Sequence, residues 1–175
     1  QFYCPGYKIV EDRRIHCAKR IGHGAQNFVQ GAQNSCNPVF IEVGLRLGVE
    51  NYYKYFKQFG LLKKTGIDLP GETTGITYTE DNMTTIDAAC NSFGQTINVN
   101  MIQMAAAFSS LINGGNYYQP HIVKRIEKPS GEVVKSFDAT LVKQTVTSST
   151  SQYLKRYLKS TVDSGLAMKA GVTGY

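Results

Sequence analysis

Ser35 and Asn37 lie two positions apart at the expected junction of two helices, and their side chains suit acid–base chemistry on an amide. Asparagine offers one acceptor and two donors, while serine relays a proton through its hydroxyl. Such a pair can orient an amide substrate and move a proton to or from a leaving group. A structural interpretation competes with this one: Asn37 caps a helix and Ser35 is a turn residue. For the tripeptide alone the structural interpretation prevails, because a serine and an asparagine recur at this spacing by chance.

The sequence has four cysteines: Cys4, Cys17, Cys36 and Cys90. They are too sparse for a scaffold held by many disulfides, and they allow three complete pairings among which the sequence does not choose. Two cysteines and two histidines near the N-terminus could be mistaken for zinc ligands: Cys4, His16, Cys17 and His23. Adjacent residues of a strand point to opposite faces, however, and the sequence lacks a Cys-x2-Cys pair, so we expect no metal.

Composition indicates a packed globular piece, since 42% of the 175 residues are hydrophobic. The net charge of +6 fits an anionic partner such as a wall polymer, an acidic membrane surface or nucleic acid. The basic residues are scattered and not interleaved with aromatic ones, which argues against nucleic acid. No segment approaches the roughly 20 apolar residues that span a bilayer. The chain opens on Gln1 without a signal pattern, and we interpret it as an excised fragment.

Apolar spacing and breaking residues predict a mainly helical α+β chain with two small hairpins. The hairpins are expected over residues 7–17 and 121–137. Helices are expected over residues 25–34, 38–47, 50–59, 85–89, 98–112 and 148–162. The helix over 98–112 is apolar around much of its circumference, which predicts that it is nearly buried. Residues 165–175 are glycine-rich and expected to be mobile.

Several blocks of the sequence resemble class B penicillin-binding proteins, and they occur in that family's order. The blocks are Gly22-His23-Gly24, Gln33–Pro38 with the SxN motif Ser35-Cys36-Asn37, residues 66–72, Ser92-Phe93-Gly94-Gln95, residues 98–108 and Asn113-Gly114-Gly115. Together they cover roughly residues 1–130. The resemblance implies a serine-type D,D-transpeptidase that cross-links peptidoglycan stem peptides through an acyl-enzyme and is acylated by β-lactam antibiotics.

The resemblance assigns catalytic and substrate-binding roles to two residues. Ser35 is expected to assist proton transfer beside the nucleophilic serine, and Asn37 to hydrogen-bond the substrate amide. His23 is expected to brace the pocket wall. No serine here is followed by a lysine three residues later, so the SxxK nucleophile is missing, and we expect it to precede this chain while the KTG strand follows residues 165–175. Lys64-Thr65-Gly66 spells KTG, but it runs into a loop and we expect it to be structural.

The same resemblance implies a fold and a setting. Residues 1–175 are expected to be a partial transpeptidase domain, the helical subdomain of a serine β-lactamase-like fold, without the central five-stranded sheet. The parent protein is expected on the extracytoplasmic face of the bacterial membrane, held by an N-terminal helix outside this chain. No cofactor is implied. The expected partners, besides stem peptides and β-lactams, are wall-synthesis proteins of cell division or sporulation.

Some sporulation-specific members of this family carry a redox-sensitive cysteine pair near the active site, and Cys17 with Cys36 is the best candidate here. A disulfide between them could block substrate access, and a thiol–disulfide oxidoreductase is the implied partner. Cys4–Cys17 is the rival pairing, which needs a register shift or a bulge if the hairpin turn centres on Asp12.

Two other functions remain open. One is a D,D-carboxypeptidase or β-lactamase-like hydrolase of the same superfamily, although the sequence shows no identifiable deacylating glutamate. The other is a non-catalytic module that binds peptidoglycan or divisome proteins. Flanking SxxK and KTG motifs in the full reading frame would favour the enzyme.

Overall fold

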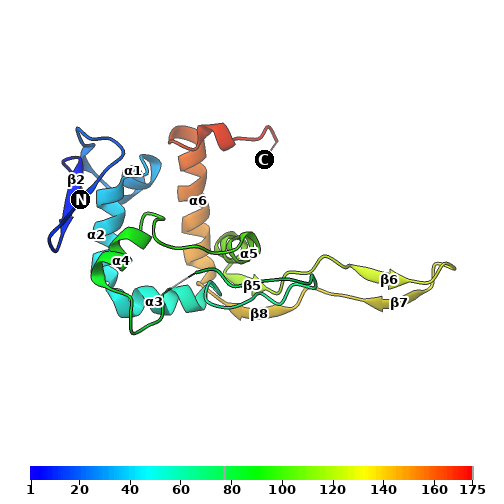
Figure 1. Cartoon of the computed structure of the whole chain (residues 1–175). Coiled ribbons are helices and arrows are strands. Elements are labelled where there is room, and N and C mark those ends of the chain that lie inside the picture. The colour runs from blue at the N-terminus through cyan, green and yellow to red at the C-terminus, as the bar shows by residue number, and fades with distance from the viewer. Residues whose placement is uncertain (77, 175) are drawn as a thin grey trace. The chain divides into compact units, whose positions relative to one another are not determined.

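The structure of this chain is a computed structural model that describes residues 1–76 and 78–174 (Figure 1). The chain forms two compact units, which are described separately. The first unit comprises Gln1–Tyr55, Tyr78–Ile97 and the chain from Tyr153 onward. The second runs from Phe56 through Ile76 and continues over Asn98–Gln152.

The first unit begins with two antiparallel strand pairs that lie beside helix α2 (Figure 1). Strands β2 (Tyr7–Val10) and β3 (Arg13–His16) form a tight hairpin, which confirms the prediction over residues 7–17. Strand β1 (Phe2–Cys4) pairs with β4 (Gly24–Gln26), a pairing that the sequence analysis did not anticipate. The helix predicted from residue 25 therefore begins at Phe28, because residues 25 and 26 belong to β4.

Three short helices complete the core of this unit. Helix α1 (Phe28–Gln33) begins at a reciprocal capping box between Asn27 and Gln30, and α4 (Thr85–Asn91) begins at one between Thr84 and Asp87. Helix α2 (Asn37–Leu47) lies against both. The buried core around α2 and α4 consists of Val10, Ile41 and Ala89, with partly buried Ile15, Leu45, Ile86 and Phe93 packed against it.

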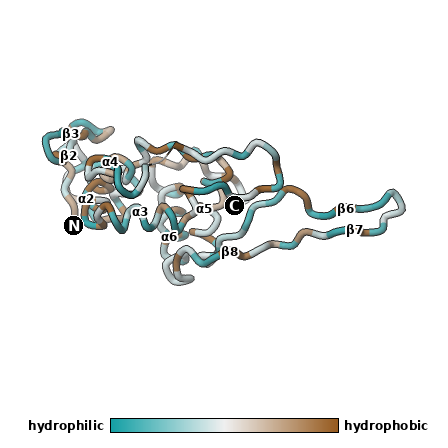
Figure 2. The backbone as a smooth tube through the Cα atoms, turned by 60° about the horizontal axis from the view of Figure 1, so that its bottom comes forward, coloured by the Kyte–Doolittle hydropathy of each residue, from teal (hydrophilic) through white to brown (hydrophobic). Residues whose placement is uncertain are grey.

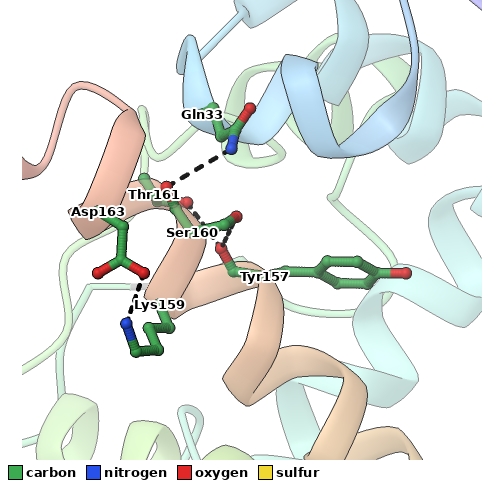
Figure 3. Close-up of polar contacts among 6 residues, drawn as sticks. All are labelled: Gln33, Tyr157, Lys159, Ser160, Thr161 and Asp163. Atoms are coloured by element: carbon green, nitrogen blue, oxygen red, sulfur yellow. Dashed lines mark hydrogen bonds and ion pairs between the residues drawn. The ribbon is translucent and has the colours of Figure 1, made fainter.

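Two further helices, α3 (Val49–Gln58) and α6 (Ser148–Ser164), each contribute residues to both units. In the first unit, the C-terminal part of α6 is held to α1 through Gln33. The Gln33 side chain donates to the Ser160 carbonyl at 3.5 Å (Figure 3), and the Gln33 carbonyl accepts from the Leu166 amide at 2.9 Å. The rings of Phe28 and Tyr157 meet edge to face with centroids 6.3 Å apart. A short 3₁₀ helix, η1 (Met168–Ala170), follows.

The second unit is built from helix α5 (Met101–Ile112) and two antiparallel strand pairs. Strand β5 (Asn116–Tyr118) pairs with β8 (Leu141–Gln144), and β6 (Arg125–Glu127) pairs with β7 (Val133–Ser136). The β6–β7 pair is the predicted second hairpin and extends as an arm with a hydrophilic tip (Figure 2). The prediction for this hairpin is confirmed.

Helix α5 is less buried than its composition predicts. Its buried residues are Gln103, Ala107 and Ser110, whereas Met101 is 87% exposed and Phe108 44%. The buried Gln103 supplies hydrogen bonds to backbone carbonyls that would otherwise lack a donor. Its side chain donates to the carbonyls of Leu61 and Lys63, at 3.2 and 2.7 Å. The prediction of a nearly buried helix is therefore wrong for this chain.

The predicted fold class is confirmed. Among residues 1–76 and 78–174 every named strand belongs to a two-stranded antiparallel pair, and the described part of the chain has no central five-stranded sheet. In the part of the chain that the structure describes, six α-helices supply most of the regular structure. None of the helices in the described part combines the length and apolar character that crossing a bilayer requires.

Candidate active site

The SxN tripeptide forms the tight connection between α1 and α2. The Ser35 amide donates to the Ala32 carbonyl at 3.0 Å, and the Cys36 amide donates to the Gly31 carbonyl at 2.9 Å. These two bonds are those of a Schellman motif, in which the residue after the helix C-cap adopts a left-handed conformation. Ser35 takes that position with φ of 46° and an exposed side chain. A serine therefore occupies a place that usually favours glycine.

Asn37 ties the start of α2 to the first hairpin. Its side-chain Nδ2 donates to the backbone carbonyl of His16 at 2.9 Å. The N-cap of α2 is Cys36, which makes no side-chain capping bond, and Pro38 follows within the first turn. The expectation that Asn37 is the N-cap is therefore wrong, because its side chain bonds to a distant carbonyl instead of the amides of its own helix.

The two helices that flank the loop approach each other closely at Gly31. A Cβ atom at position 31 would lie 2.6 Å from Cγ1 of Val39, closer than real Cβ contacts allow. Val39 is buried, as is Cys36 three residues before it. The loop between the helices is therefore held at both ends by packed residues, while Ser35 remains exposed at its turn.

The middle residue of the motif belongs to a buried cluster. The thiols of Cys4, Cys17 and Cys36 and a ring nitrogen of His23 all lie within 4.8 Å of one another, and Cys17 Sγ is 3.6 Å from His23 Nδ1. The three cysteines are at most 1% exposed and carry free thiols. His23, expected to brace a substrate pocket, contributes its ring nitrogen to this cluster. His16, considered with the N-terminal cysteines from sequence, is not part of the cluster.

Cys4 lies outside the register of the β2–β3 hairpin and still reaches Cys17. In the structure Cys4 ends β1, a separate strand, and Gly6 with φ of 97° turns the chain before β2 begins. The Cys17 amide then donates to the Gly6 carbonyl at 2.8 Å, which brings Cys17 beside Cys4.

Ionisation differs among the clustered groups. Burial raises the pKa of the Cys36 thiol to about 12. Burial also opposes ionisation of Cys4, but hydrogen bonds from the backbone of His23 and Gly6 and from the other two thiols outweigh it, so the pKa of Cys4 is lowered. Burial and the nearby charge of Lys19 lower the pKa of His23, which favours its neutral form. These hydrogen bonds therefore favour the thiolate form of Cys4.

Lys64-Thr65-Gly66 lies in a loop, as expected, and is held by Glu72. The Glu72 carboxylate accepts from the Thr65 amide and hydroxyl, both at 2.7 Å, and from the Gly66 amide at 3.0 Å. These bonds lower the pKa of Glu72 against the opposing effect of its burial. Because the amides of Thr65 and Gly66 both donate to the Glu72 carboxylate, this segment forms a structural turn and not a strand edge open to a substrate.

Comparisons with known proteins place the chain in a family. Residues 1–175 match the family described as "Penicillin binding protein transpeptidase domain". The chain is 42% identical over 176 residues to stage V sporulation protein D of Bacillus subtilis (strain 168), covering 100% of this chain and 27% of that protein. It is 28% identical over 148 residues to penicillin-binding protein PbpB of Mycobacterium tuberculosis (strain ATCC 25618 / H37Rv), covering 81% of this chain and 22% of that protein.

A solved structure agrees with these relatives. The crystal structure of penicillin-binding protein 3 from Mycobacterium tuberculosis in complex with aztreonam matches with a TM-score of 0.87 at 25% identity, over 100% of this chain and 41% of that chain. The chain thus belongs to the penicillin-binding protein transpeptidase domain family, and its relatives place it with the class B members. It spans about a quarter of the length of the curated relatives described above.

The geometry adds one relationship that sequence reasoning missed. Cys36 was grouped with Cys17 alone, and Cys4 and His23 were considered apart from it. A signal was present in the near-symmetrical spacing Cys4-x12-Cys17-x5-His23-x12-Cys36, with a glycine on each side of the histidine. That spacing becomes meaningful only when β1 pairs with β4, because this pairing brings the first cysteine beside the Gly22-His23-Gly24 segment.

Proposed function

We propose that this chain is the part of a peptidoglycan D,D-transpeptidase that supplies the SxN motif. The observation that carries the proposal is the Ser35 turn: a serine held at φ of 46°, exposed, in a chain of this family. Non-glycine residues in the left-handed region are uncommon, and such outliers gather at functional sites. Asn37 is anchored next to it through the His16 carbonyl.

The two side chains have distinct roles in the proposed reaction. A serine nucleophile elsewhere in the protein attacks the D-Ala-D-Ala peptide bond of one stem, D-alanine leaves, and the amine of a second stem resolves the acyl-enzyme. Ser35 relays the proton between the nucleophile's base and the leaving or attacking amine. Asn37 donates to the substrate amide carbonyl and thereby orients the peptide. We expect this chain alone to form no acyl-enzyme, because none of its serines has a lysine three residues later.

The remaining assignments follow from the same proposal. The substrate is a peptidoglycan stem peptide, the inhibitors are β-lactams, and the protein works on the extracytoplasmic face of the bacterial membrane. The similarity to a protein named for stage V of sporulation favours a wall-synthesis role in sporulation over one in cell division. The Cys17–Cys36 pair is proposed as a redox-sensitive pair, served by a thiol–disulfide oxidoreductase, whose disulfide would cross the SxN loop.

Fluorescent penicillin tests the catalytic proposal. This chain alone is expected to show no covalent label, whereas the protein at its full native length is expected to be labelled. Ser35→Ala in the full-length protein should slow labelling by about 100-fold or more, the effect of losing a positioned proton-transfer group. The matched control is Ser130→Ala, which changes an exposed serine in the β6–β7 turn and should leave labelling unchanged. Equal rates for the two variants, or a label on this chain alone, would contradict the proposal.

A further inference from the structure

The β6–β7 arm of the second unit leaves two strand edges without a neighbour. Among the described residues β6 pairs only with β7, so this two-stranded sheet has one free edge on each side. The arm projects from the rest of its unit (Figure 2), and every residue of both strands is exposed. A free edge presents unpaired amide and carbonyl groups to which another strand can bind.

The hydrogen bonds of the hairpin identify which backbone groups of β6 face outward. The Lys124 carbonyl accepts from the Phe137 amide at 2.9 Å, and the Lys128 amide again donates across the hairpin. In an antiparallel pair the backbone groups of successive residues point alternately toward the partner strand and away from it. The amide and carbonyl groups of Arg125 and Glu127 therefore point away from β7.

The two free edges differ in regularity. In β7 the residue Val134 has no partner, because Val133 is opposite Glu127 and Lys135 is opposite Ile126. An extra residue of this kind is a β-bulge, which twists an edge and protects it against pairing. Strand β6 contains neither an extra residue nor a proline. It therefore offers the more regular edge to a further strand.

One face of the arm combines positive charge with apolar side chains. Ile126 is opposite Lys135 and Lys124 is opposite Phe137, and residues directly opposite each other share a face. The Lys135 ammonium group lies 4.6 Å from the centre of the Phe137 ring. Neither lysine forms an ion pair with a described residue, whereas both glutamates of the hairpin are already paired with cations. This face therefore favours a partner with acidic and apolar side chains.

The base of the arm is anchored within its own unit. The Asp68 carboxylate accepts from the amides of Ile122 and Val123, at 2.8 and 2.9 Å. The bonds from Val123 and Ile122 lower the pKa of Asp68, so the group remains ionised at neutral pH. The Gln119 side chain also donates to the Gly66 carbonyl at 2.7 Å. An arm held in this way loses less conformational freedom when a partner binds.

We propose that the free edge of β6 binds an extended, acidic segment of a protein partner, which adds to the arm as a third strand. Backbone hydrogen bonds with Arg125 and Glu127 supply affinity, as in other cases of strand addition. An acidic side chain opposite Lys124 pairs with it, and Lys135 adds attraction across the same face. An anionic lipid surface would attract both lysines, but it has no ladder of donors and acceptors to match the edge. The proposal does not depend on the proposed catalytic function.

A synthetic peptide tests the charge preference of the edge. The probe is fluorescently labelled Thr-Glu-Thr-Val-Thr-Glu-Thr, which places two glutamates and a valine on one face of a strand. Its binding to the full-length protein is measured by fluorescence anisotropy at low ionic strength. A control peptide with lysine in place of both glutamates should bind about 10-fold more weakly. Equal binding of the two peptides, or no binding of either up to about 1 mM, would overturn the proposal.

Backbone methylation of the peptide separates strand pairing from charge attraction and leaves the protein unchanged. In an added strand only every second amide faces the arm. N-methylation of the glutamate and valine amides removes one alternate set of donors, and N-methylation of the threonine amides removes the other. We expect one methylated peptide to lose binding and the other to retain it. Equal binding by both would show that the peptide does not pair with a strand edge.

Two proline variants identify the edge that is used. Arg125→Pro removes an outward amide of β6 and spares the bonds of the hairpin, and Ser136→Pro, at the position opposite Arg125, does the same on β7. Peptide binding should fall by about 10-fold or more in Arg125→Pro and persist in Ser136→Pro. Arg125→Gln, which removes the charge alone, should weaken binding less than Arg125→Pro. Equal loss in these two Arg125 variants, or loss in Ser136→Pro alone, would contradict strand addition at β6.

Other occupants of the edge would give different results. A dimer of the wild-type protein in sedimentation equilibrium that disappears in Arg125→Pro would mean that a second copy of this chain occupies the edge, and it would overturn the proposal. Displacement of the peptide by phosphatidylglycerol vesicles, but not by phosphatidylcholine vesicles, would indicate an anionic lipid surface and would equally overturn it. Penicillin labelling reports on the proposed function, and its loss would not bear on the arm.

Discussion

The side chain of Asn37 donates a hydrogen bond to the backbone carbonyl of His16 at 2.9 Å. The two residues are separated by 21 positions, and the bond joins the first turn of α2 to the last residue of β3. Cys17 directly follows His16, and Cys36 directly precedes Asn37. Both cysteines belong to the buried cluster. The bond therefore aligns the SxN turn with the buried cluster.

Removal of this bond should cost stability. We expect Asn37→Ala to lower the free energy of unfolding by about 1 kcal/mol, the typical net value of such a bond, as measured by urea denaturation. Asn51→Ala is the matched control, because Asn51 also donates from Nδ2 to a backbone carbonyl, that of Leu47, but within its own helical region. If the two variants lost equal stability, the His16 bond would have no special role in holding the turn.

Ser35 should be a residue at which function opposes stability. Ser35→Gly should raise the free energy of unfolding by about 1 kcal/mol, because glycine adopts the left-handed conformation without the penalty of a Cβ. The same variant should lose penicillin labelling in the full-length protein, since the hydroxyl is removed. Ser109→Gly on the exposed face of α5 is the control and should instead lower stability by about 0.5 kcal/mol. A destabilised Ser35→Gly protein would show that the left-handed turn is not strained.

Oxidation of the cysteine cluster should form one particular disulfide, between Cys17 and Cys36. Treatment of the protein with a disulfide oxidant should transfer two electrons from Cys17 and Cys36 to the oxidant, releasing two thiols from it and leaving one protein disulfide. Peptide mapping by mass spectrometry without reduction identifies the pair. A Cys4–Cys17 or Cys4–Cys36 bridge would contradict the proposed pair; the lowered pKa of Cys4 makes it the competing nucleophile. Free thiols throughout would remove the redox proposal altogether.

Local patterns predicted much of the secondary structure because they depend on neighbours along the chain. The capping residue Thr84, the helix end at Gly48 and the turn between the strands of the second hairpin are all such signals. The prediction failed for β1 and β4, whose three-residue strands carry little periodicity and are stabilised by pairing with each other. It also failed for the burial of α5, because an apolar helix shows which faces could be buried and not which ones have a partner.

The amino-acid sequence by itself determined the family, the SxN motif and the main helices, since each depends on residue order or local preference. Only the tertiary structure decided what surrounds the motif. It placed Ser35 in a left-handed turn, directed Asn37 to the His16 carbonyl and gathered Cys4, Cys17, His23 and Cys36 around one point. These relationships depend on strand pairing and close glycine contacts between segments that are distant in the chain, and no spacing rule along the sequence specifies how such segments meet.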